Sequence, residues 1–122
     1  MAKLILFADD EPYMHRLMEH HLSRAGYEVL GATNGREALD KAAAESPDLV
    51  ILDFMMPEMD GITALRLLKD DVRTSAIPVI ILTASAQSGA RQCSEEGGAS
   101  GFFTKPFSPT QLLWEIKRLL DK

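Results

Sequence analysis

Five polar side chains follow apolar runs in this sequence, and together they have the right chemistry for phosphoryl transfer. Asp9 and Asp10 follow one run, Asp53 ends a second, and Thr83 and Lys105 follow two others. Clustered carboxylates repel one another and bind protons more tightly unless a cation compensates. Mg²⁺ prefers such oxygen ligands and often shares them with phosphate, while a lysine and a hydroxyl can position the anion. A carboxylate beside the metal can itself attack phosphorus and form an aspartyl phosphate.

The elements that must position these side chains alternate along the chain. Apolar runs predict strands at residues 4–8, 27–32, 49–52, 77–82 and 101–104, and amphipathic segments between and after them predict five helices. Strict alternation implies a parallel sheet with helices on both faces. The predicted fold is α/β: a five-stranded, doubly wound, flavodoxin-like sheet in the order 2-1-3-4-5. Its ligand site lies beyond the carboxyl ends of strands one and three, where Asp9, Asp10 and Asp53 fall.

Local signals mark where three of the helices begin. Pro12 suits the first turn of a helix over residues 12–25. Asn34 with Glu37 three residues later has the pattern of a capping box. The Ser-Pro pair at residues 108–109 starts the last helix in the same way, with a serine cap and proline at the first helical position.

The two remaining helices carry unequal signals. Apolar residues at helical spacing from Ile62 to Val72 predict a helix there. The segment from Ser85 to Gly98 holds three serines, ends in two glycines and has almost no large apolar residue. A helix in this segment is therefore expected to be marginal.

Length and composition limit the class of protein. The 122 residues are expected to form one domain over residues 1–122, and 46% apolar residues are enough for a core. The net charge of −5 argues against direct nucleic-acid binding, and no apolar run is long enough to cross a membrane, so a cytoplasmic protein is expected. Cys93 alone cannot form an internal disulfide, and His15, His20 and His21 are expected to be exposed or partly packed.

Four motifs resemble those of the receiver domain of two-component response regulators, the family of chemotaxis-Y-like proteins. They are Asp9-Asp10-Glu11, the stretch at residues 52–61, Thr83-Ala84 and Lys105-Pro106-Phe107. Each motif by itself is a weak signal for the family, but all four occur in order at predicted strand ends, which makes the combination specific. The resemblance covers essentially the whole chain and implies a phosphorylation-controlled signalling domain.

The resemblance implies a role for each site residue. Asp53 would be the phosphoacceptor, and Mg²⁺ would be the cofactor. Its ligands would be Asp10 directly, Asp9 mainly through water, Asp53, and the backbone carbonyl of Met55. Thr83 would hydrogen-bond the phosphoryl oxygen and Lys105 would pair with it.

The resemblance also implies a conformational switch. The Lys105–Pro106 bond would be cis. Phe102 falls at the position of the aromatic switch residue, whose ring would turn as Thr83 moves inward on phosphorylation. Adjacent strand residues face opposite ways, so a fixed core position for Phe102 or its neighbour Phe103 stays open. Met55 and Ser85 fall at the two positions that tune the lifetime of the phosphoryl group.

The implied partners are proteins. A sensor histidine kinase or a phosphotransfer protein would donate the phosphoryl group, and a downstream protein target or a covalently linked output domain would respond to it. The chain would catalyse only its own phosphorylation and dephosphorylation and would not be an enzyme acting on a separate substrate. No direct contact with nucleic acid or membrane is expected.

Three other functions remain open from the residues. A flavodoxin-type cofactor binder shares the strand order, but Asp9-Asp10-Glu11-Pro12 would repel a bare phosphate where that fold binds one. A phosphatase of the haloacid-dehalogenase type needs a second aspartate two residues after the nucleophile, where this chain has Met55. A receiver-like module used only for binding would have no need of the full set of site residues: Asp9, Asp10, Asp53, Thr83 and Lys105.

Overall fold

The computed structural model describes residues 2–84 and 88–120, which form a parallel sheet between two layers of helices. The sheet has the strand order β2-β1-β3-β4-β5, as predicted. Its strands are β1 (Leu4–Ala8), β2 (Glu28–Ala32), β3 (Leu49–Asp53), β4 (Val79–Thr83) and β5 (Gly101–Thr104). All neighbouring strands pair in parallel, so their carboxyl ends share one edge of the sheet.

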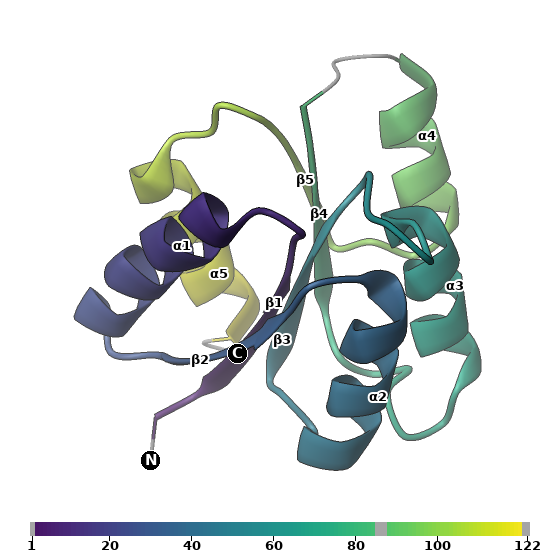
Figure 1. Cartoon of the computed structure of the whole chain (residues 1–122), viewed down its shortest axis with the longest axis horizontal. Coiled ribbons are helices and arrows are strands. Elements are labelled where there is room, and N and C mark those ends of the chain that lie inside the picture. The colour runs from purple at the N-terminus through teal and green to yellow at the C-terminus, as the bar shows by residue number, and fades with distance from the viewer. Residues whose placement is uncertain (1, 85–87, 121–122) are drawn as a thin grey trace.

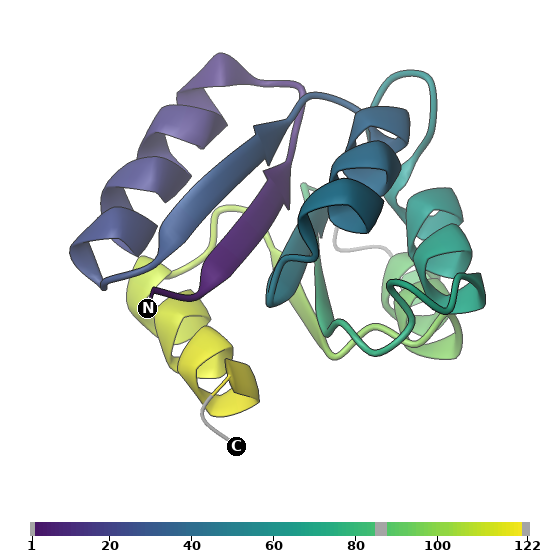
Figure 2. The ribbon, with the colours of Figure 1, turned by 90° about the horizontal axis from the view of Figure 1, so that it is seen from below.

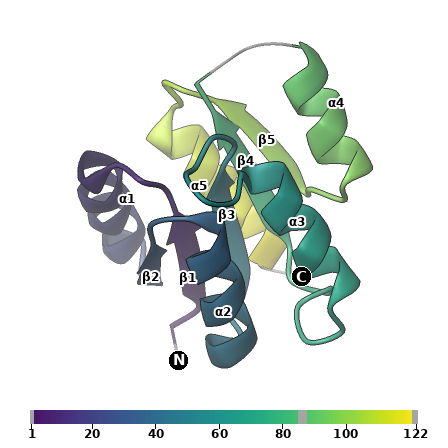
Figure 3. The same ribbon diagram turned by 45° about the vertical axis from the view of Figure 1, so that its right-hand side comes forward.

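Five helices cover the two faces of the sheet (Figure 1). They are α1 (Pro12–Arg24), α2 (Gly35–Glu45), α3 (Gly61–Asp70), α4 (Ser88–Glu96) and α5 (Pro109–Leu120). Helices α1 and α5 lie on one face, and α2, α3 and α4 lie on the other, as Figures 1 and 2 both show. Figure 3 shows α2, α3 and α4 in sequence across their face. The predicted doubly wound architecture is confirmed.

Alternate side chains of the central strands fill two separate cores. Leu6, Val50 and Ile81 face α2 and α3, whereas Ile5, Ile51 and Ile80 face α1 and α5. All of these side chains are fully buried. A strand covered on both faces needs apolar residues at every position, which explains the unbroken apolar runs. The two cores hold the strand ends, and therefore the polar residues there, in fixed relative positions.

The predicted helix caps form, with one difference. The Asn34 side chain accepts a hydrogen bond of 2.8 Å from the backbone N–H of Glu37, as expected of an N-cap. The carboxylate of Glu37 does not return to Asn34 as in a standard capping box; it accepts hydrogen bonds from the backbone N–H and the hydroxyl of Thr33. At α5 the Ser108 hydroxyl accepts from the N–H of Gln111, as predicted.

The predicted continuation of the third helix to Val72 is wrong. Helix α3 ends at Asp70, and Val72 is 92% exposed. Asp71 binds the Arg73 side chain and backbone, and the Thr74 hydroxyl donates a 2.7 Å hydrogen bond to the Leu68 carbonyl at the helix end. These local hydrogen bonds stabilise a turn, and they replace the apolar contact that the helical spacing of Val72 suggested.

The expected helix in the weak segment is present as α4, which covers residues 88–96. Across residues 2–84 and 88–120, no helix combines the length and apolar character needed to cross a bilayer.

Candidate functional site: an acidic cluster at the sheet edge

Asp9 follows β1 and is fixed through both its backbone and its side chain. It is fully buried, and its N–H donates to the carbonyl of Ala32 on β2 at 3.0 Å. One carboxylate oxygen accepts from the N–H of Glu11 and the other from Lys105, each at 2.9 Å. Asp10, the next residue, is exposed. The pair therefore offers one anchored carboxylate and one accessible carboxylate.

Asp53 ends β3 and is only 6% exposed. The following residue, Phe54, donates to Leu82 of β4 and accepts from Gly61, so the chain turns tightly after the strand. A Cβ at Gly61 would clash with the Asp53 carbonyl oxygen and with the backbone of Phe54. Glycine at the start of α3 thus lets that helix approach the backbone that carries Asp53.

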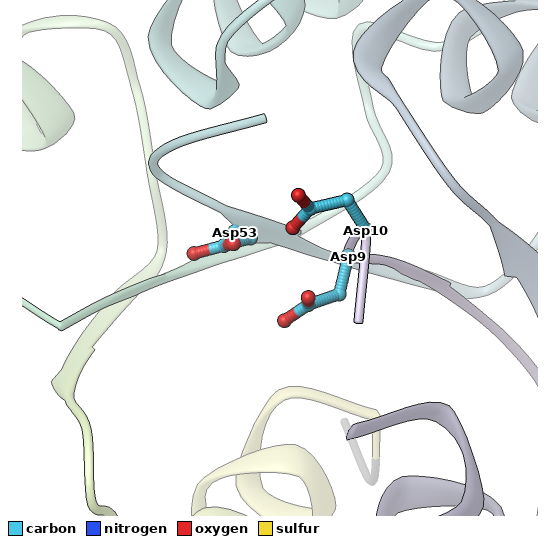
Figure 4. A group of neighbouring side chains, drawn as sticks. All are labelled: Asp9, Asp10 and Asp53. Atoms are coloured by element: carbon cyan, nitrogen blue, oxygen red, sulfur yellow. The ribbon is translucent and has the colours of Figure 1, made fainter. Parts of the chain in front are cut away.

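Asp9, Asp10 and Asp53 meet at the sheet edge, as their positions in the sequence predicted. Each offers a carboxylate oxygen, and these oxygens lie within 4.8 Å of one another. Figure 4 shows Asp9 and Asp10 projecting from the chain after β1 beside Asp53 at the end of β3. Oxygen donors at this spacing fit a hard divalent cation such as Mg²⁺.

The cluster perturbs the charge state of Asp53. Burial raises the pKa of Asp53 from 3.8 to about 6, and the negative charge of Asp9 acts in the same direction. The Lys105 ammonium and the N–H of Met55 oppose this rise by favouring the carboxylate. A buried carboxyl with a raised pKa in an acidic cluster is typical of a functional site.

Lys105 supplies the positive charge of the site. Its Nζ lies 2.9 Å from an Asp9 oxygen and 3.4 Å from an Asp53 oxygen. Burial opposes the charge on Lys105, yet the hydrogen bond to Asp9 and the attraction of both carboxylates raise its pKa above the ordinary value. The Lys105–Pro106 bond is cis, as expected. The ammonium is therefore shared by the two buried carboxylates.

Thr83 and the two phenylalanines lie on the neighbouring strands. Thr83 ends β4 and is fully buried, and its carbonyl accepts from the N–H of Lys105. Phe102 packs with the core beneath α2 and α3, whereas Phe103 packs with the core beneath α1 and α5, so the expected opposite orientation is confirmed. The Arg91 guanidinium of α4 lies 5.1 Å from the centre of the Phe102 ring.

The sequence also drew attention to Met55, Ser85 and His15. The Met55 side chain is 68% exposed in the loop after β3. Ser85 lies outside the described residues. His15 has a specific contact, because its Nε2 atom lies 2.6 Å from the Asp9 carbonyl oxygen. Its position one turn into a helix that follows Asp9 was the only sequence signal for that contact.

The fold and this site define a receiver-type α/β domain with an acidic cluster beyond the ends of β1 and β3. Comparison with known proteins agrees. The family model described as "Response regulator receiver domain" matches residues 5–117. The chain belongs to this family: it is a receiver domain of the two-component response regulators. The flavodoxin-type and phosphatase alternatives are therefore set aside.

The chain is similar to response regulators in several bacteria. It is 39% identical over 122 residues to the alkaline phosphatase synthesis transcriptional regulatory protein PhoP of Bacillus subtilis, covering 100% of this chain and 50% of the relative. It is 44% identical over 119 residues to the response regulator PleD of Caulobacter vibrioides, covering 98% of this chain and 26% of the relative. The chain thus spans between a quarter and half of the length of these relatives.

Solved structures show the same architecture. A putative response regulator from Chloroflexus aurantiacus matches with a TM-score of 0.95 at 32% identity, covering 100% of both chains. The chemotaxis protein CheY4 of Vibrio cholerae matches with a TM-score of 0.91 at 33% identity, covering 98% of this chain and 100% of that one.

Proposed function

We propose that Asp53 accepts a phosphoryl group from a phosphohistidine of a sensor histidine kinase or a phosphotransfer protein. The observation that carries this proposal is the cluster of three carboxylate oxygens within 4.8 Å, with the Lys105 ammonium between Asp9 and Asp53. Buried acids with a shared ammonium are costly to assemble for stability alone. They suit a site that must neutralise and position a phosphoryl group.

In the proposed reaction an Asp53 oxygen attacks phosphorus while the phosphorus–nitrogen bond of phosphohistidine breaks. The electron pair of that bond leaves with the imidazole, which takes up a proton. Lys105 pairs with one phosphoryl oxygen, and the Thr83 hydroxyl donates to another. Because the pKa of Asp53 is about 6, the Asp53 carboxyl is ionised in most molecules at neutral pH and can act as the nucleophile.

Mg²⁺ is the proposed cofactor, and when bound it neutralises charge on the carboxylates and on the phosphoryl group. Asp10, Asp53 and the Met55 carbonyl would hold it directly. Asp9 would contribute mainly through water. Support for that indirect role comes from the Asp9 oxygens, which already accept hydrogen bonds from Glu11 and Lys105.

The phosphoryl donor would dock beside Lys105. An apolar groove of about 400 Å³ opens there, lined by Tyr13, Met14 and Leu17 of α1 and by Pro106 and Phe107 after β5. Tyr13 is 62% exposed. A groove of this character next to the phosphoacceptor suits the apolar face of a partner helix.

The proposed response uses Phe102. Thr83 would move toward the phosphoryl group, and the Phe102 ring would turn into the vacated space. Phe102 is half-buried beneath Arg91 of α4, so its movement would alter the surface formed by α4, β5 and α5. A downstream protein or a covalently linked output domain would read that change.

We propose that residues 1–122 act as one receiver unit in the cytoplasm. It would catalyse only its own phosphorylation and dephosphorylation, and it would contact neither nucleic acid nor membrane directly. Met55 offers no acid or amide to orient a hydrolytic water, so dephosphorylation is expected to be slow to intermediate. Met55→Asn is expected to accelerate the decay of the phosphorylated protein, and an unchanged rate would contradict this shielding role.

The direct test is intact mass spectrometry after incubation with acetyl phosphate and Mg²⁺. A single phosphoryl adduct is expected in the wild type. It should disappear with Mg²⁺ removed and in Asp53→Asn, whereas Asp40→Asn, which changes an exposed acid on α2, should retain it. Absence of the adduct in a folded wild-type protein that also fails to bind beryllofluoride would overturn the proposal and favour a phosphorylation-independent binding module.

A further inference from the structure

His15 on α1 reaches back to the backbone of the acidic pair. Its Nε2 atom lies 2.6 Å from the carbonyl oxygen of Asp9. A carbonyl oxygen only accepts hydrogen bonds, so Nε2 must carry the hydrogen. The contact is therefore a hydrogen bond donated by the imidazole to the chain segment that bears Asp9 and Asp10.

The His15 ring is held on two further sides. It meets the Phe7 ring in an edge-to-face arrangement, with the centroids 5.0 Å apart and the planes at 66°. Gly31 of β2 leaves the space that the ring occupies, because a Cβ there would lie 3.1 Å from Nδ1 and 3.3 Å from Cε1. This packing restricts the imidazole to an orientation that aims Nε2 at Asp9.

The bonded carbonyl belongs to the peptide group that joins Asp9 to Asp10. A peptide group is planar, so fixing its carbonyl oxygen also fixes its N–H and the direction in which the Asp10 chain continues. The other polar groups of Asp9 are bonded to Ala32, Glu11 and Lys105. The Glu11 contact closes a ring that contains the Asp9–Asp10 peptide, and the His15 contact adds a hydrogen bond to the carbonyl oxygen of that peptide itself.

We propose that His15 is a positioning residue that orients the Asp9–Asp10 peptide and so preorganises the acidic pair for Mg²⁺. The proposal rests on the proposed function of the acidic cluster as a Mg²⁺ site. His15 touches neither the cation nor the phosphoryl group; it acts through the backbone of Asp9. A site whose ligands are already oriented loses less conformational freedom on binding, which strengthens affinity.

Two substitutions separate the hydrogen bond from the packing of the ring. His15→Phe keeps an aromatic ring beside Phe7 and removes the donor. His15→Gln loses the ring but keeps an N–H donor at a similar reach. Calorimetric titration with Mg²⁺ at a fixed, mildly alkaline pH should show about three- to tenfold weaker binding in His15→Phe, as expected for one lost hydrogen bond. Affinity within about twofold of wild type is expected in His15→Gln, because a donor at that reach restores the bond.

Two metal-free measurements on the same proteins complete the test. Nitrogen-15 spectra of the wild-type imidazole should show the tautomer protonated at Nε2. The backbone amide signal of Asp10 should shift in His15→Phe and return toward the wild-type position in His15→Gln. Gly31→Ala crowds the imidazole ring while keeping the histidine, so it should also weaken Mg²⁺ binding. It tests the same contact if His15→Phe does not fold.

The proposal is overturned by an Nε2 atom without hydrogen in the wild type, by wild-type Mg²⁺ affinity in His15→Phe, or by equal losses in the Phe and Gln variants. These readouts need no phosphorylation. If wild-type protein neither forms a phosphoryl adduct nor binds beryllofluoride while His15→Phe weakens Mg²⁺ binding, the proposed function fails and the positioning role of His15 stands.

Discussion

Two strand–helix units of this domain, β3–α3 and β4–α4, lie side by side and are built differently. Each strand is buried at all five positions, and each ends in a residue of the proposed site, Asp53 or Thr83. The helices that follow are not alike. Helix α3 buries Ala64, Leu65 and Leu68, whereas among α4 residues 91–96 only Ser94 is buried.

This difference between α3 and α4 suggests that phosphorylation takes place at the strand ends and that the response to it takes place in α4. The proposed site needs Asp53 held at a set position, and it needs Thr83 near enough for its hydroxyl to move toward the phosphoryl group. Helix α3 is anchored by apolar burial and by the Asp60 side chain, which accepts from the N–H of Thr63 at 2.8 Å. Helix α4 has little apolar surface to bury, so less free energy is needed to displace it. We therefore expect phosphorylation to be read out through α4.

The largest expected effect comes from removing an anchor of α3. Leu65 is fully buried, so Leu65→Ala should lower the free energy of unfolding by about 3 kcal/mol. On α4, Cys93→Ala should cost less than about 1 kcal/mol, because it removes only one sulfur atom and Cys93 is only half-buried. Urea denaturation of both variants measures the difference. Equal losses would break the contrast between the two helices.

The second expected effect concerns the buried charge at the end of β3. The pKa of Asp53 is raised from 3.8 to about 6, so the folded protein holds this proton more tightly than the unfolded chain. Stability contributed by Asp53 is therefore greatest below about pH 4 and falls as the pH rises to about 6, where the ionised carboxylate becomes the costly form.

Asp53→Asn removes that cost. In the presence of EDTA the variant should be more stable than wild type at neutral pH by on the order of 2 kcal/mol, with the advantage shrinking toward pH 4. Denaturation at several pH values measures both proteins. A wild type that is equally stable or more stable at neutral pH would show that Lys105 fully compensates the buried charge.

A smaller effect is expected at the start of α3. Asp60→Ala removes the side-chain cap and should lower the free energy of unfolding by about 1 kcal/mol. Asp60→Asn retains a capping oxygen and should lose much less. The same denaturation experiment compares the two, and similar losses in both would assign the effect to charge rather than to capping.

The smallest effect is expected on α4 itself. Arg91 is exposed and stacks over the Phe102 ring, so Arg91→Ala should cost about 0.5 kcal/mol. Its more specific consequence is faster amide exchange within α4 and not within α3. Hydrogen exchange measures both helices in one experiment, and unaltered exchange in α4 would show that this contact does not hold the helix.

Much of this contrast could be predicted from the sequence. Unbroken apolar runs identified the strands, and the polar residues after them converged because parallel strands share one edge. The weak apolar pattern of residues 85–98 predicted a marginal helix, and α4 lies within that segment. The prediction that the third helix continues to Val72 was wrong, because helical spacing alone does not reveal that Asp71 and Thr74 form a competing turn.

Other features depend on three-dimensional distances that spacing does not encode. The sequence placed Glu37 in a capping box but could not show that its carboxylate would turn to Thr33. Histidines on an amphipathic helix are usually surface residues, so the contact of His15 with Asp9 required the structure. The sharing of Lys105 between two carboxylates likewise follows from packing and not from any local motif.

We propose that the domain performs its chemistry at the ends of β1 and β3 and responds through α4. Hydrogen exchange of the wild type with Mg²⁺, with and without beryllofluoride as a phosphoryl mimic, tests it most directly. We expect amide exchange in residues 88–96 to change by about tenfold or more while exchange in residues 61–70 of α3 stays the same. Unchanged exchange in α4 with beryllofluoride bound, or a change confined to α3, would contradict it.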